Sequence, residues 1–539
     1  AHEQPQQQQR SLSGTTTPVS HSKTRVNDDF FLQAFSIRSN YRHLMSRDRH
    51  PLAPLHAMRV MATVWIVLGN TVAYMVPVLK ESNGLSLIMN VEHNWAAQWV
   101  IGSYFAVDIF FVLSGFMAGH SFLVQLKAIN RIGPWKPIRR LHYGFIDIPQ
   151  MYLYRFCRIV PSLAFVMLVF VGLTDLTNPG PLHFLYEDDY IDPCRKHWWT
   201  NVLLINNFYP PSSAAGKGNV CMDWTWYLAT DFNMYLVAPL FVLLFWKHRP
   251  LGWGVVTLTL VASTAFSTYL GMLYQYSMNP FKHYGRSTPF IYDAYNFAGY
   301  NKPWTRCVPY LMGLAAAMTF HEYGARIKLN RCFVITGLFS VIVLLLFIVF
   351  IAPVNYFAGI EQLSINVTAL PSGSPADVIH QGSYYGNPNW SILMCTVYSV
   401  FSHVIIGAST TFVLFVFATG HGGFLRRLTK FYFWTPLSRL CFGVYLIHPI
   451  LITSGYSGAY SLQFYEPLTA VTSWIAMTVL SFIGSFVLYM LVEKPFKQCS
   501  TVLLRKLCCR LPPPANSGKG GEHNLEEGLM SDDSDDVFA

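Results

Sequence analysis

The sequence predicts an all-α, polytopic membrane protein with about ten transmembrane helices, and three observations lead to this fold class. Hydrophobic residues make up 52% of the 539 residues and charged residues only 12%, which is too apolar for an ordinary water-soluble domain. Apolar runs of bilayer length recur along the chain. Basic residues gather in short clusters between these runs, so the net charge of +10 indicates membrane anchoring and no nucleic-acid partner.

The chain divides into an arm, a membrane domain and a tail. Residues 1–50 form an arm whose first part is rich in Gln, Ser and Thr and lacks the apolar core of a signal peptide, so we expect it to be disordered and cytosolic. Residues 51–497 form the membrane domain, and 498–539 a cytosolic, disordered tail in which Cys and basic residues precede an acidic stretch. We predict spans of roughly 20 residues, the sixth being the shortest, at 57–78, 97–123, 152–174, 225–246, 252–274, 305–320, 333–353, 392–418, 436–454 and 467–491.

The loops between these spans predict the orientation. Segments 127–140, 247–249, 326–331 and 426–430 are all basic and fall on one side with both termini, as cytosolic loops do. On the other side, Cys194 and Cys221 are candidates for a disulfide in an oxidising lumen, and Asn366 begins a candidate glycosylation sequon. We therefore expect a multi-pass protein of the endoplasmic reticulum or plasma membrane. The ten cysteines show no paired spacing of a zinc site, so no metal is expected.

Ionisable side chains inside the spans are candidate functional residues, because they are costly in hydrocarbon. At a rise of about 1.5 Å per residue, Asn70 lies roughly 16 Å deeper than Arg59, and His448 lies about 13 Å deeper than Arg439. Arg155 and Arg158 open the third span, and His120 lies in the inner half of the second. These arginines and histidines predict a cationic cavity, open to the cytosol, that binds phosphate groups. Snorkelling of the arginines to lipid headgroups is the alternative.

Two acids and one serine carry further hypotheses. By the same counting, Asp108 and Asp231 lie toward the lumenal half, where they would contact a hydroxyl acceptor or pair with a basic partner. Ser114 lacks the G-x-S-x-G surroundings of a hydrolase nucleophile. The Gly115-x-x-x-Gly119 spacing beside Ser114 favours close helix packing instead.

Ordered motifs between about residues 50 and 500 resemble the acyltransferase-3 family, and most closely its animal branch, the "nose resistant to fluoxetine" proteins. The motifs are Leu55-His-Ala-Met-Arg59, Asp108-Ile-Phe-Phe-Val-Leu-Ser-Gly-Phe116, Tyr154-Arg-Phe-Cys-Arg158-Ile-Val-Pro161, Asp223-Trp-Thr-Trp-Tyr-Leu228, Gly443-Val-Tyr-Leu-Ile-His448-Pro449 and Val492-Glu-Lys-Pro-Phe496. The resemblance implies acyl transfer from cytosolic acyl-CoA to a hydroxyl on a lipid, sugar or small molecule. Its donor-binding residues would be Arg59, Arg155, Arg158 and Arg439, and its catalytic residues would include Asp231.

The chain departs from the family pattern at one position. The family places a histidine eleven positions after the arginine of the first span, and this chain has Asn70 there. An amide cannot act as a general base near neutral pH, so His448 becomes the first candidate for that role. An enzyme impaired by Asn70, an active lineage with one changed residue and a non-catalytic carrier of lipids or other hydrophobic molecules all stay open, and a transporter ranks last because no inverted repeat is visible.

The animal branch often also carries a lumenal N-terminal domain with cysteines. The first fifty residues show no such pattern. We therefore expect either a shortened form or a missing start, and any function of that domain lies outside this sequence.

Overall fold

The computed structural model describes residues 34–47, 52–75, 94–131, 148–173, 180, 183–210, 220–274, 299–324, 327–351, 391–460 and 464–508. All regular secondary structure in these ranges is helical, as the composition predicts. Nine helical segments in them are long and apolar enough to cross a membrane. They contain α3 (Pro54–Ala73), α6 and α7 (Gln98–Ile101 and Ala106–Arg131), α9 (Ile148–Gly172), α13 (Trp226–Lys247), α14 (Arg249–Leu273), α17 (Arg331–Ile351), α20 (Ile392–Ala418), α22 (Trp434–Ser457), and α23 with α24 (Pro467–Leu488 and Lys494–Cys508).

The predicted sixth span corresponds to helix α16, Pro303–Tyr323. This helix is long enough to cross a membrane, but it carries Arg306 and is not among the nine segments of the described chain that are apolar enough. It nevertheless lies within the bundle, packed against α7, α14 and α20. The polytopic fold class is confirmed, and the sidedness of the two termini stays a prediction.

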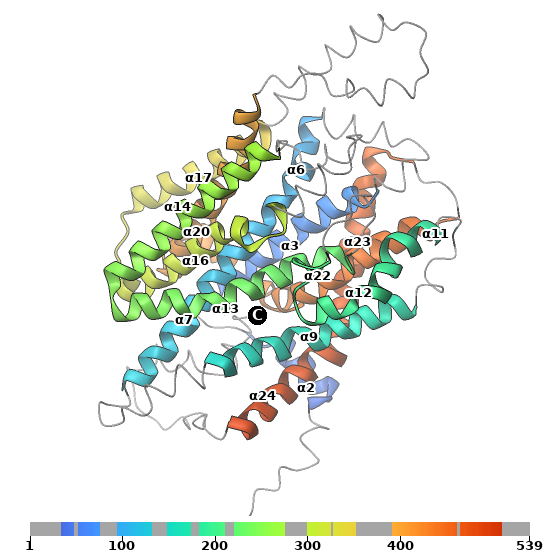
Figure 1. The fold of residues 1–539 in the computed structure, drawn as a ribbon, viewed down its shortest axis with the longest axis horizontal. Coiled ribbons are helices and arrows are strands. Elements are labelled where there is room, and N and C mark those ends of the chain that lie inside the picture. Colours follow the sequence, from blue (N-terminus) through green and yellow to red (C-terminus); the bar gives the residue numbers. More distant parts are fainter. Residues whose placement is uncertain are drawn as a thin grey trace, which may run out of the picture.

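Two groups of helices flank a central layer (Figure 1). α14, α16, α17 and α20 gather on one side, and α9, α11 (His183–Tyr186) and α12 (Asp192–Val202) lie on the other. The central layer contains α3 and α22, which pack on each other, and α23 packs on both of them. Residues of the N-terminal and C-terminal halves therefore meet in the middle of the bundle.

Helices α7 and α16 approach closely because small residues face backbone at their crossing. A Cβ atom on Gly115 would lie 2.0 Å from the carbonyl oxygen of Tyr310, and one on Gly313 would lie 2.0 Å from that of Val112. No side chain fits at such distances, so both glycines are needed for this contact. The packing role predicted for the Gly115 segment is confirmed.

Two helices lie in segments that the sequence assigned to the disordered arm and tail. Residues 37–44 form helix α2 (Ile37–Leu44), capped by the side chain of Ser36, where the sequence indicated only a disordered arm. The buried Asn40 anchors this helix, since its side-chain amide donates to the carbonyl oxygens of Ala34 and Met490. At the other end, α24 continues to Cys508, past the predicted domain boundary at 497.

The two features predicted to face the lumen, the disulfide and the glycosylation sequon, have different outcomes. Cys194 at the start of α12 and Cys221 form a disulfide, the pair that the sequence singled out. Asn366 lies outside the described residues. The disulfide joins two buried cysteines of the core cluster between α9, α12 and α13, so it closes the loop that precedes α13.

Candidate active site

Asn70 and His448 meet in the centre of the bundle. Asn70 lies in the last turn of α3, and His448 lies in the middle of α22, which packs against α3. The side-chain amide nitrogen of Asn70 is 2.8 Å from Nε2 of the buried His448. The structure thus places the candidate base directly beside the position at which the motif pattern predicts a histidine.

The hydrogen bonds of His448 define its tautomer. Nδ1 is 2.8 Å from the carbonyl oxygen of Val444, one turn earlier in α22. A carbonyl oxygen only accepts, so Nδ1 carries a proton and donates it. In the neutral imidazole Nε2 then has the lone pair, and this nitrogen accepts the hydrogen bond from Asn70. The nitrogen that could take a proton from a substrate is therefore the one that faces position 70.

Arginines from two helices lie within electrostatic range of one another. The buried Arg59 of α3 interacts electrostatically with Arg155 and Arg158 of α9 and with Tyr227 of α13. The ring of Tyr227 contacts that of Tyr445, which contacts His448, at centroid distances of 5.8 and 6.5 Å. Three of the four predicted donor-binding arginines therefore lie together, and a pair of tyrosines connects them to His448.

Arg155 is held by partners from two other helices. Its guanidinium forms an ion pair with Asp231 of α13 and donates to the hydroxyl oxygen of Ser114 on α7 at 3.1 Å. The same guanidinium lies over the ring of Tyr235, 4.1 Å from its centroid. Ser114 is thus a partner of Arg155, in addition to lying beside the close helix contact at Gly115.

The contact between Arg155 and Asp231 corrects the predicted depths. Counting along the predicted spans placed these residues in opposite halves of the membrane. Helix α9 begins at Ile148, ahead of the expected residue 152, so Arg155 lies in the second turn of its helix and not at its start. Helix starts are also not aligned in one plane, and an ion pair fixes the true relation of Arg155 to Asp231.

Arg439 does not join the other arginines through its hydrogen bonds. One of its terminal nitrogens lies within hydrogen-bond distance of the carbonyl oxygens of His43, Leu44 and Ser46 and of the Ser46 hydroxyl. These groups form the end of α2, where a helix leaves carbonyl oxygens without partners. The prediction that Arg439 contributes to the donor site missed this role, because α2 was not expected to form.

His120 and Asp108 also have surroundings of their own. The ring of His120 stacks on Phe116 and contacts Phe320, at centroid distances of 6.0 and 5.8 Å. Asp108 is fully buried and pairs with Arg306 of α16 and His403 of α20, two residues that the sequence interpretation did not select. Their signal was available, since both are ionisable groups inside or at the edge of predicted spans.

These positions can be compared with a family of known sequences. A family model described as an acyltransferase domain matches residues 53–490, which include Arg59, Asn70, Arg155, Asp231 and His448. The chain belongs to the acyltransferase-3 family. It is therefore a multi-pass member of a family of membrane acyltransferases, as the motifs predict.

Individual relatives agree with this assignment. The chain is 27% identical over 489 residues to Nose resistant to fluoxetine protein 6 of Caenorhabditis elegans, which covers 88% of this chain and 54% of that protein. It is 25% identical to the Regulator of hypoxia-inducible factor 1 of the same organism, over 56% of this chain and 55% of that protein. It is 26% identical to the Peptidoglycan O-acetyltransferase OatA of Listeria monocytogenes, over 32% of this chain and 26% of that protein.

The chain spans about half the length of the two nematode relatives. The activities of those whole proteins therefore do not transfer directly to this family member. No solved structure matches the chain.

Proposed function

We propose that this acyltransferase-3 protein transfers an acyl group from acyl-CoA, bound from the cytosolic side, to a hydroxyl acceptor on a lipid, sugar or small molecule. The observation that carries the proposal is the 2.8 Å contact between Asn70 and Nε2 of His448. This contact supports a general base beside position 70, where the family pattern has a histidine on α3. Here the base would be His448 of α22. The relative named as an O-acetyltransferase adds support for a hydroxyl acceptor.

The donor would lie along α3. Arg59 is eleven residues before Asn70, roughly 16 Å along the helix axis. Guanidinium groups grip phosphate oxygens in a bidentate manner, so Arg59 and Arg158 would bind the phosphates of CoA while the thioester reaches His448. Arg155 already forms an ion pair with Asp231, so its positive charge is less available to a ligand. We therefore assign Arg155 a positioning role.

The reaction follows from the tautomer of His448. Nε2 takes the proton of the acceptor hydroxyl as its oxygen attacks the thioester carbonyl carbon, and a tetrahedral oxyanion forms. The C–S bond then breaks, and the CoA thiolate leaves and receives the proton from Nε2. The acceptor hydroxyl must first displace the amide of Asn70 from Nε2, which the family histidine would not require, so we expect slow turnover.

A non-catalytic carrier of lipids or other hydrophobic molecules is the second candidate. The observation that favours it is the same hydrogen bond, since Asn70 occupies the lone pair of the only imidazole at this site among the described residues. A carrier would hold acyl chains or lipids in the same position without releasing CoA.

Release of CoA thiol separates the two candidates. Full-length protein in phosphatidylcholine nanodiscs would receive radiolabelled acetyl-CoA or palmitoyl-CoA, and both CoA thiol and labelled product would be followed. We expect release above that of empty nanodiscs. A His448→Ala change should lower it by about 10² to 10⁴, whereas His120→Ala, which removes a histidine packed against Phe116 and Phe320, should leave most of it. Bound lipid without any CoA release would favour the carrier.

A further inference from the structure

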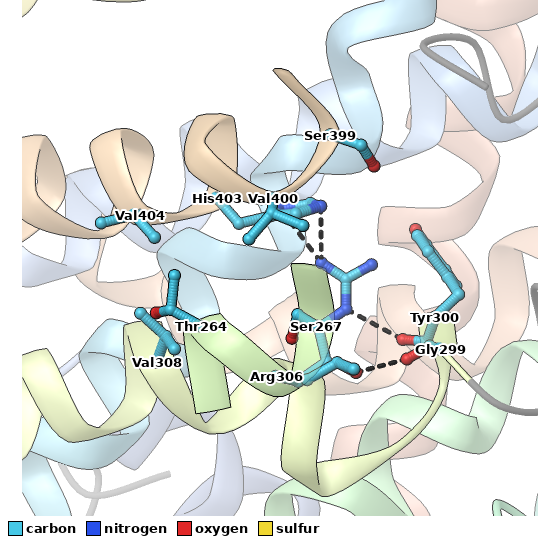
Figure 2. Close-up of a pocket in the computed structure, with 11 residues that line it drawn as sticks. Thr264, Ser267, Gly299, Tyr300, Arg306, Val308, Ser399, Val400, His403 and Val404 are labelled. Carbon is cyan, nitrogen blue, oxygen red and sulfur yellow. Dashed lines mark hydrogen bonds between the residues drawn. The ribbon is translucent and has the colours of Figure 1, made fainter. Parts of the chain in front are cut away.

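A cavity lies beside Arg306 and His403, the partners of Asp108, and its lining includes none of the arginines of the candidate active site. It has a volume of about 40 Å³, room for a few water-sized groups, and lies between α14, α16, α20 and the residues that precede α16. Figure 2 shows the guanidinium of Arg306 in it, between His403 of α20 and the backbone of Gly299 and Tyr300. Asp108, the partner of Arg306, is six residues from Ser114 on α7, roughly 9 Å along the axis, so the two polar groups are separate.

The wall of this cavity carries hydroxyl groups. Thr264 and Ser267 come from α14, Thr305 from α16 and Ser399 from α20. Thr264 and Thr305 donate to backbone carbonyl oxygens, so their protons are already used. Ser267 differs, because its side-chain oxygen is buried and has no hydrogen-bond partner. Ser267 is only 7% exposed, and a buried hydroxyl without a hydrogen-bond partner is unfavourable. The position therefore indicates a ligand that supplies this partner.

The charges around the cavity favour an uncharged ligand. Arg306 is paired with the fully buried Asp108 at 3.3 Å, and Asp108 also contacts Nδ1 of His403 at 2.5 Å. The Arg306 guanidinium additionally donates to the carbonyl oxygen of Tyr300 at 2.9 Å. A phosphate or carboxylate would bring a negative charge close to Asp108, and the basic residues of the lining, Arg306 and His403, already contact that aspartate. A neutral hydroxyl group can instead both donate to and accept from this wall.

The exposed side chains on the outer faces of the same helices indicate that the ligand comes from the membrane. Leu258 and Val261 of α14 are 68% and 61% exposed, and Phe401 of α20 is 44% exposed, as expected for side chains that face lipid. On the predicted topology Ser267 and Arg306 lie near lumenal helix ends, and Asp108 lies toward the lumenal half of its span. A lipid in the outer leaflet can therefore present its headgroup to the cavity while its chains stay outside.

We propose that this cavity is a second binding site, separate from Asn70 and His448, for an uncharged hydroxyl-bearing group. A neutral glycerolipid headgroup and a free polyol share this chemistry. The ligand hydroxyl hydrogen-bonds with Ser267, and the rest of the group fills the space between Tyr300 and Val404. The site does not depend on acyl transfer.

Photolabelling tests the proposal without any acyl donor. Full-length protein in phosphatidylcholine nanodiscs would be irradiated with a diazirine-bearing diacylglycerol or, in a parallel arm, a diazirine-bearing phosphatidic acid. We expect the diacylglycerol to label the peptides around 299–308 and 399–404, and phosphatidic acid to label them no more than background. Unlabelled diacylglycerol should compete. Competition by free glycerol at millimolar concentration would support the same site with a free polyol as its ligand.

Matched variants locate the label. Val404→Phe fills the cavity without removing a polar group and should reduce labelling about tenfold or more. Ser267→Ala removes one hydrogen bond and should weaken binding by about five- to tenfold. Thr268→Val is the control, because the Thr268 hydroxyl bonds to Thr264 of its own helix and does not line the cavity. No labelling, labelling unchanged in Ser267→Ala, or equal labelling by phosphatidic acid would overturn the proposal and leave a cavity that holds only water.

Discussion

Asn70 donates a hydrogen bond to Nε2 of His448, and this contact joins the first and ninth predicted spans at the candidate active site. The two residues are 378 positions apart in the chain. Only the packing of α22 on α3 brings them together, and the same packing places His448 beside position 70.

The first prediction concerns the coupling of these two residues. If Asn70 acts by holding His448, Asn70→Ala will change CoA release in the native background but not in a His448→Ala background, because the orienting contact has no further role once the base is gone. Effects of residues that act as one unit are non-additive. A double-mutant cycle on the CoA-release rate measures this coupling, and strictly additive effects would contradict it.

The second prediction concerns the ion pair of Arg155 with Asp231. Arg155→Ala leaves the Asp231 carboxylate without its cation, and breaking such a pair costs about 3–5 kcal/mol when it is fully buried. Arg155 is partly exposed, at 19%, so we expect a smaller loss of thermal stability. Asp231→Asn in the Arg155→Ala background should recover part of it. Thermal unfolding in detergent measures both variants, and a double variant less stable than Arg155→Ala would contradict the pairing.

The third prediction concerns helix α2. Arg439→Ala removes the guanidinium that contacts the carbonyl oxygens of His43 and Leu44, so α2 should detach more often. Hydrogen bonds to a charged group contribute about 1.5–3 kcal/mol. We therefore expect trypsin to cleave this segment about ten times faster in the variant than in the native chain, or faster still. Arg426→Ala is the control, since Arg426 donates to the carbonyl oxygen of Phe417 elsewhere. Equal cleavage rates in both variants would count against this anchoring role.

The fourth prediction concerns the crossing of α7 and α16. Gly115→Ala would place a Cβ atom 2.0 Å from the Tyr310 carbonyl oxygen, so the helices must move apart. Overpacking of this kind costs about 1–3 kcal/mol. Gly254→Ala on α14 meets nothing within 4 Å and serves as the control. Melting temperatures of the two variants decide the point, and a Gly115→Ala protein as stable as Gly254→Ala would show that the crossing is not tight.

The spans could be predicted from the sequence because lipid imposes a simple rule. Backbone groups in hydrocarbon must be satisfied internally, so each crossing needs a helix of bilayer length, and such lengths are visible as apolar runs. α16 shows where this rule weakens. Arg306 lowers the apolarity of this segment, yet the helix is held inside the bundle by α7, α14 and α20. Helix α2 was missed because it is stabilised by contacts between residues far apart in the sequence. Asn40 donates to the carbonyl oxygen of Met490, and Arg439 donates to that of Leu44.

The candidate site could be predicted only in part. Arg59, Arg155 and His448 were found because ionisable groups in a span stand out. Which groups adjoin was not predictable, since a count along one helix says nothing about its neighbours. The contact of Asp231 with Arg155 was therefore not expected, and the basic partner allowed for Asp108 was not identified as Arg306 or His403.

The measurement that tests the central claim most directly is the initial rate of CoA release by Asn70→His compared with the native chain, in the same nanodiscs and at saturating acyl-CoA. If position 70 and His448 share one catalytic centre, the native chain turns over slowly, and the added imidazole raises the rate by about 10² to 10⁴. If neither protein releases CoA above empty nanodiscs, the chain is not an acyltransferase at this site.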